Sequence, residues 1–184
     1  MLNSFIVDVL QKDNVEICKV DDSFAITREK DHIDIRIEDK KQIIIIENKI
    51  KSGINGIKET KNNTPHEKES QLSEYYNKIV EGEKDKDHKR SIHCFIFVPK
   101  YNYKLIETEK DVLKDGDKYH LISYEAIYEF FSDKQWDKCK YIDDFRKALH
   151  RHTSKYPDSL REDTYYKFLE RINELKKTKR IGLG

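Results

Sequence analysis

The feature that most constrains the fold of this chain is the pair of segments His32–Ile37 and Gln42–Ile50, HIDIRI and QIIIIENKI. The first segment alternates polar and apolar residues, which is the period of a half-buried strand. The second is a β-branched run that is too short for a comfortable helix and also reads as a strand. Glu38 to Lys41 form the turn between them. We therefore predict a β-hairpin at the centre of a sheet.

Charged residues follow the most apolar strand directly, without a turn residue between them. Glu47, Asn48 and Lys49 come immediately after four consecutive isoleucines. Removing a carboxylate or an ammonium from water costs on the order of several kcal/mol per ion unless a partner or a metal compensates. Because side chains alternate along a strand, Glu47 and Lys49 point to one face and Asn48 points to the other. This strand end is therefore a candidate site for chemistry.

Asp34 lies on the partner strand and is the natural second acid of such a site. An even-length turn centred on Asp39–Lys40 would place Asp34 opposite Ile45, on the face of Glu47. The two carboxylates would then be diagonal neighbours, roughly 7–8 Å apart at the backbone, and could converge on one cation. With Lys49 beside them, this predicts a hard-oxygen site for Mg²⁺ or Mn²⁺ suited to phosphodiester hydrolysis. A slip of one residue would destroy the arrangement.

The order of these residues resembles the signature of the PD-(D/E)XK nuclease superfamily. Asp34 followed by Glu47-Asn48-Lys49 matches the acid, spacer and Asp/Glu-x-Lys pattern, with Ile33 standing where a loosely held proline would be. Further on, Gln71-Leu72-Ser73-Glu74-Tyr75 looks like the Q-x-x-x-Y helix motif of several branches of that superfamily. The resemblance covers roughly Val15 to Pro99.

The resemblance implies a fold, an activity and a cofactor. The expected fold is α/β and restriction-endonuclease-like, with a mixed sheet flanked by helices and a helical C-terminal part. The expected activity is metal-dependent hydrolysis of DNA, in phage defence or DNA processing, with Mg²⁺ or Mn²⁺ as the cofactor. It also implies that Asp34, Glu47 and the backbone carbonyl of Asn48 bind the metal. Lys49 would orient or deprotonate the attacking water.

Gln71 and Tyr75 would support this site from the start of a helix. They are four residues apart and so share a helix face, where Gln71 could bond a metal ligand or a phosphate and Tyr75 could orient Lys49 or stack on a base. On spacing alone, the better interpretation of Tyr75 is an ordinary core aromatic with its hydroxyl reaching solvent, and only the order of the two motifs reverses this. Glu16 and Glu29 are further candidates for the metal site, although exposed strand glutamates are common.

Periodicity and turn residues predict the remaining elements, within a single domain of 184 residues. Its core is expected at about 15–132 and its C-terminal helices at about 141–180. Lys51 to Glu69 reads either as a loop that folds over bound nucleic acid, through Lys51, Lys58 and Lys61, or as a surface loop. The other expected strands are Val15–Lys19, Phe24–Arg28, Ser91–Pro99 and Tyr119–Ile122, and the expected helices are Leu2–Leu10, Ser70–Gly82, Ser123–Phe131, Tyr141–Thr153 and Asp158–Lys179.

Composition limits the partners that the chain can attract. Charged residues make up 39% of the sequence, but 36 basic and 35 acidic side chains leave a net charge of only +1. Binding to nucleic acid must therefore use local patches, and the basic residues of the C-terminal helices could line such a groove or simply be solvated. Three widely separated cysteines without the spacing of a zinc site or disulfide framework, and no apolar run of membrane-spanning length, indicate a cytoplasmic protein.

Two other function classes fit the same residues. One is a nucleic-acid-binding module that keeps the fold without the chemistry. The other is an assembly subunit in which the acids and the lysine form only a buried salt bridge. Cutting both strands of a duplex would favour a homodimer.

Overall fold

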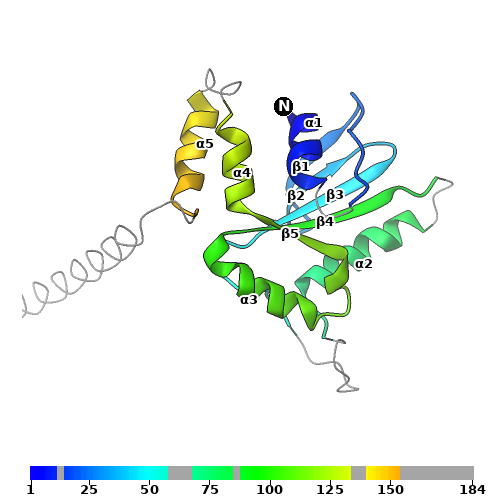
Figure 1. Ribbon diagram of the computed structural model, residues 1–184. Coiled ribbons are helices and arrows are strands. Elements are labelled where there is room, and N and C mark those ends of the chain that lie inside the picture. The colour runs from blue at the N-terminus through cyan, green and yellow to red at the C-terminus, as the bar shows by residue number, and fades with distance from the viewer. Residues whose placement is uncertain (12–14, 58–67, 85–87, 134–139, 154–184) are drawn as a thin grey trace, which may run out of the picture.

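The computed structural model describes residues 1–11, 15–57, 68–84, 88–133 and 140–153, and these contain a five-stranded mixed sheet (Figure 1). The strands lie side by side in chain order: β1 (Ala25–Lys30), β2 (Ile33–Glu38), β3 (Gln42–Asn48), β4 (Ser91–Val98) and β5 (Tyr119–Ser123). The first three strands are antiparallel, whereas β4 runs parallel to both β3 and β5. The expected mixed sheet flanked by helices is confirmed.

Helices cover both faces of this sheet. The chain enters them in the order α1 (Leu2–Phe5), the π-helical turn η1 (Ile6–Leu10), α2 (Gln71–Glu83), α3 (Lys100–Asp111), the 3₁₀ turn η2 (Gly116–Lys118), α4 (Tyr124–Phe131) and α5 (Lys140–His150). Parallel strands need a crossover connection, and α2 and α3 lie in the two crossovers that lead into β4 and β5. In Figure 1, α2 and α3 lie on one side of the sheet and α1 and α4 on the other.

Two apolar clusters, one on each face, explain why β3 is so apolar. Ile43 and Ile45 pack in the cluster that contains residues of α2 and α3, while Ile44 and Ile46 pack in the cluster that contains residues of α1, η1 and α4. All four side chains are almost fully buried. Burying an isoleucine side chain contributes about 1.5–3 kcal/mol. The central strand is thus fixed by packing on both sides, and its last residues are held firmly in place.

The turn between β2 and β3 is fixed by the side chain of Asp39. Its Oδ1 accepts hydrogen bonds from the backbone N–H groups of Lys41 at 2.7 Å and Gln42 at 2.8 Å. Its own N–H donates to the carbonyl of Gln42 at 3.0 Å. This Asx-type arrangement closes the hairpin around Lys40 and Lys41.

The resulting register corrects one sequence prediction. Ile45 pairs with Arg36, not with Asp34, because the turn is centred one residue later than expected. Moving the turn centre by one residue shifts the pairing by two positions. A shift of two positions preserves which residues share a face. Continued by one step, this register sets Asp34 across from Glu47.

Most of the expected elements are present, with shifts of one to three residues at their ends. Ser123 caps α4 as predicted, and its hydroxyl accepts a hydrogen bond from the N–H of Ala126. The predicted strand Val15–Lys19 is wrong, because this segment has no ladder pairing. Instead the amide of Gln42 bonds both backbone groups of Cys18, at 3.2 and 2.6 Å, and satisfies them locally.

One helix escaped prediction, and one lies outside the described residues. Sequence periodicity missed α3 because only Asn102 and Ile106 of its residues are buried. The expected helix Asp158–Lys179 falls outside the described ranges, as do Lys58 and Lys61. Within the parts of the chain that the structure describes, none of the helices combines the length and apolar character that crossing a bilayer requires.

Candidate active site

The carboxyl end of β3 brings Glu47 and Lys49 together on the α2 face of the sheet. Glu47 Oε1 lies 2.8 Å from Lys49 Nζ, and the two side chains are only 8% and 4% exposed. The backbone N–H of Lys49 donates to the carbonyl of Phe97 on β4 at 2.9 Å, so pairing with the sheet continues up to the lysine. An ion pair this well buried exchanges little with solvent and keeps both groups in position.

The environment of Glu47 is unusually unfavourable for its charge. Burial raises the pKa of this carboxyl, and the nearby Asp34 charge raises it further, against the lowering effect of Lys49. Its second oxygen, Oε2, is buried and has no hydrogen-bond partner among the described residues. Buried acceptors are nearly always paired in folded proteins. This oxygen is therefore available to a cation.

Asp34 lies at the start of β2, beside the carboxyl end of β3. Its Oδ2 accepts a hydrogen bond from the backbone N–H of Asn48 at 2.7 Å. One step beyond the observed pair Ile35 and Ile46, the antiparallel register sets Asp34 across from Glu47. The structure thus gathers Asp34, Glu47 and Lys49 at one end of the sheet. Their proximity explains why the Asp34 charge raises the pKa of Glu47.

The first turns of α2 place Gln71 and Tyr75 near these acids. The helix begins after Ser70, whose hydroxyl accepts from the N–H of Ser73 at 3.4 Å. The Gln71 side-chain amide donates to the Tyr75 hydroxyl. Tyr75 is buried, and burial together with the charges of Glu47 and Asp34 raises its pKa to about 12. Its hydroxyl therefore stays protonated at neutral pH.

Gln71 offers a second buried acceptor on the same side. Its Oε1 is buried and lacks a partner within the described part of the chain. Periodicity alone made Tyr75 a core residue, and the structure shows that it is one. It shows as well that the hydroxyl of that core residue is bonded to Gln71 and feels the charge of Glu47.

Tyr124 is a site residue that sequence reasoning missed. Its hydroxyl donates to Oδ1 of Asn48, and burial raises its pKa to about 12. The side chain of Asn48 points to the face opposite Glu47, as strand alternation predicts. The sequence did contain a signal for this residue. Tyr124 is the first residue after the Ser123 cap, so it follows the carboxyl end of a strand that runs parallel to its neighbour.

A cavity of about 500 Å³ lies on that opposite face, and we call it the edge cavity. Asp34, Asn48 and Tyr124 line its polar end. Glu29 lines it as well and is exposed, whereas Glu16 is exposed but does not line it. Of the two extra acids considered from sequence, Glu29 is the one that the fold brings near Asp34.

The described residues contain no cluster of three or more His, Cys, Asp or Glu side chains arranged around one metal position. The oxygen donors at this edge are mixed in kind. They are the carboxylates of Asp34 and Glu47 and the amide oxygen of Gln71, which has no partner among the described residues. Oxygen donors of this kind are the ligands that Mg²⁺ prefers in proteins.

The fold and the site together define a class: an α/β domain that presents two carboxylates and a lysine at the carboxyl end of its central strand. Residues 2–155 match the family model described as the PD-(D/E)XK nuclease superfamily. The chain belongs to this superfamily, and its sheet and flanking helices have the restriction-endonuclease-like fold. No curated protein and no solved structure matched the chain significantly.

Proposed function

We propose that this protein is a metal-dependent nuclease that hydrolyses phosphodiester bonds in DNA and acts in phage defence or DNA processing. The observation that carries the proposal is the buried pair of Glu47 and Lys49, 2.8 Å apart, with Asp34 bonded to the next peptide N–H. A purely structural ion pair would not need a second carboxylate beside it. In a member of a nuclease superfamily, this arrangement supports catalysis.

Mg²⁺ or Mn²⁺ fits the donors at this edge. Asp34, Glu47 and the backbone carbonyl of Asn48 would hold the ion, and the unpartnered Oε2 of Glu47 is a donor ready for it. When bound, the ion would supply Lewis acidity toward the phosphodiester. Its charge would also relieve the unfavourable burial that raises the pKa of Glu47.

Lys49 provides the positive group nearest to these acids. Its ammonium, held by Glu47, can orient an attacking water and stabilise the negative charge that develops on the phosphoryl oxygens. Tyr75 and Gln71 act from the far side of Glu47. Because the pKa of Tyr75 is about 12, its hydroxyl remains a hydrogen-bond donor at neutral pH and can hold a carboxylate or a phosphate oxygen.

A cleavage assay tests the proposal. Supercoiled plasmid and end-labelled single- and double-stranded DNA and RNA are incubated with the protein in Mg²⁺, Mn²⁺ or Ca²⁺. We expect DNA cleavage in Mg²⁺ or Mn²⁺, and its loss in Lys49→Met. Lys41→Met changes a lysine in the hairpin turn at the other end of β3 and is the matched control. Full activity in Lys49→Met would contradict the assigned site.

A nucleic-acid-binding module without catalysis is the second candidate. It is favoured by the direct Glu47 to Lys49 contact, which neutralises the buried acid without a metal. Binding to labelled DNA without cleavage in any of the three cations would support it. We also propose a homodimer for cutting both strands of a duplex, and sedimentation analysis with and without DNA measures this directly.

A further inference from the structure

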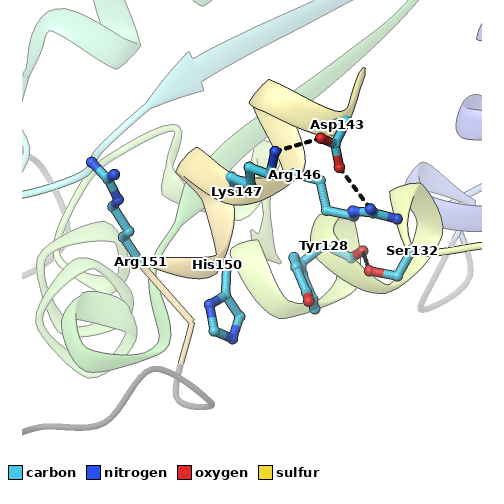
Figure 2. Close-up of a pocket in the computed structure, with 7 residues that line it drawn as sticks. All are labelled: Tyr128, Ser132, Asp143, Arg146, Lys147, His150 and Arg151. Carbon is cyan, nitrogen blue, oxygen red and sulfur yellow. Dashed lines mark hydrogen bonds and ion pairs between the residues drawn. The ribbon is translucent and has the colours of Figure 1, made fainter. Parts of the chain in front are cut away.

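A second cavity, of about 540 Å³, lies between α4 and α5 and is strongly basic (Figure 2). We call it the basic cavity. Most of its lining comes from α5 and from the residue that follows it, and the rest comes from the end of α4. The lining residues are Asp143, Arg146, Lys147 and His150 of α5, Arg151 just after α5, Tyr128 of α4 and its C-cap Ser132.

The basic cavity concentrates positive charge that the chain as a whole lacks. Among the described residues that line it, Asp143 is the one carboxylate, and it forms ion pairs with Arg146 at 2.7 Å and with Lys147 at 2.5 Å. Arg151 adds a third cation. Because the net charge of the whole protein is only +1, this is the kind of local patch through which it can attract a polyanion.

Aromatic contacts hold the two walls of the cavity together. The rings of Tyr128 and His150 lie 5.2 Å apart at an angle of 38°. Phe131 and Phe145 meet edge to face at 5.3 Å. Each contact joins α4 to α5, so the helix that carries the basic side chains is packed firmly against α4.

The same helix connects this cavity to the candidate active site. Phe145 and Leu149 of α5 line the edge cavity, whose polar end is formed by Asp34 and Asn48. The basic side chains of α5 line the basic cavity instead. A strand leaving Asp34 across α5 must therefore pass over one helix width. That width is about 10–12 Å, which corresponds to about three nucleotides at 3.4 Å each.

We propose that the basic cavity is a phosphate-binding subsite that holds the DNA backbone about three nucleotides from the scissile bond. The inference rests on the proposed nuclease function and deepens it by assigning where the substrate strand runs. Lys147 has a side chain that is 67% exposed, so it can exchange water for a phosphate oxygen. Tyr128 and Ser132 form the opposite wall, where the Ser132 hydroxyl donates to the backbone carbonyl of Tyr128 at 2.7 Å, so the donors for a phosphate are the basic side chains.

The double variant Lys147→Ala/Arg151→Ala tests the subsite. Its matched control is Lys40→Ala/Lys41→Ala, which removes the same charge from exposed side chains of the β2–β3 turn. Dissociation constants for a labelled DNA duplex are measured in Ca²⁺ by fluorescence anisotropy, over a series of salt concentrations. Cleavage rates are then measured in Mg²⁺.

Losing two phosphate contacts should reduce the slope of log affinity against log salt by about 1.8 and weaken binding by about 60-fold at 0.1 M salt. The control should leave both the slope and the affinity unchanged. In cleavage, KM should rise with little change in kcat, since the removed groups do not touch the reacting atoms.

Asp143→Asn provides a test in the opposite direction. Removing the carboxylate that pairs with Arg146 and Lys147 should tighten DNA binding several-fold, a gain that misfolding cannot produce. Unchanged affinity and salt slope in the double variant, in a wild-type protein that cleaves DNA, would overturn the subsite alone. A wild-type protein that neither binds nor cleaves DNA would overturn the proposed function and the subsite together.

Discussion

Replacing Lys49 by methionine should destabilise the protein strongly, because it leaves the charge of Glu47 buried without its partner. Methionine keeps most of the length of the lysine side chain, so the change removes charge more than volume. The two side chains are 4% and 8% exposed, and solvent screening is correspondingly weak. Removing one partner from a buried ion pair typically costs 3–5 kcal/mol.

The chemistry of the remaining carboxyl group sets an upper limit on this loss of stability. Glu47 can take up a proton instead of keeping a buried charge. At pH 7, protonating a glutamate with an ordinary pKa of about 4.3 costs about 3.7 kcal/mol. We therefore expect Lys49→Met to lower the free energy of unfolding by about 3–4 kcal/mol. The double variant Glu47→Gln/Lys49→Met carries no buried charge and should recover to within about 1 kcal/mol of wild type.

Urea unfolding at pH 7, followed by circular dichroism, measures both variants. It should be repeated with Mg²⁺. If Glu47 belongs to a metal site, the cation replaces the missing ammonium, and saturation at 100 times its Kd returns about 2.7 kcal/mol to Lys49→Met. The double variant, which lacks the carboxylate, should gain much less. A loss below about 1 kcal/mol in Lys49→Met, or no recovery in the double variant, would refute the reasoning from burial.

Three further predictions concern the groups around this site. Tyr124→Phe removes the hydroxyl bonded to Asn48 and should lower the cleavage rate several-fold while costing about 1 kcal/mol of stability, measured by kinetics and by urea unfolding. Asp39→Ala removes the acceptor of two turn N–H groups and should cost about 2–3 kcal/mol, whereas Asp39→Asn, which keeps one acceptor oxygen, should cost less by the same assay. Glu38 is partly desolvated, which opposes ionisation, but its ion pairs with Arg36 and Arg90 lower its pKa below 4.5. The ionised Glu38 therefore stabilises the folded state fully above that pH, and this stabilisation is lost as the pH falls through the lower pKa of the folded state. The urea midpoint of Glu38→Gln should accordingly depend less on pH than that of the wild type as the pH is lowered below about 5.

The central hairpin was predictable because its pattern records the burial of each strand. In the alternating segment His32–Ile37, Ile35 and Ile37 pack in one cluster, whereas the apolar run Ile43–Ile46 packs in the clusters on both faces. The exact register was not predictable. It is set by the hydrogen bonds of one side chain, Asp39, and sequence spacing does not reveal which turn residue will make them.

Polar elements were harder to recognise than apolar ones. Helix α3 buries only Asn102 and Ile106, so its periodicity is lost among charged residues. The segment Val15–Lys19 has apolar residues at strand spacing, yet its backbone is satisfied by the side chain of Gln42 and not by a neighbouring strand. In both cases tertiary contacts decided the structure, and local pattern carried little information about them.

The prediction of the candidate site depended on which strand ends meet, and this is less sensitive to errors in the turn than the exact residue pairing is. Because side chains alternate with a period of two, an even shift of β2 against β3, such as the observed shift of two positions, leaves the two strand ends facing each other as expected. Asp34 lies at this end, where it bonds the N–H of Asn48 and lines the edge cavity. Strand alternation does not predict which helix residues pack over the sheet near these carboxylates. The approach of Tyr75 from α2 on one face and of Tyr124 from α4 on the other comes from helix packing over the sheet. The carboxylates were thus foreseeable from the strands, while the hydroxyls bonded to Gln71 and Asn48 around them were visible only in the folded chain.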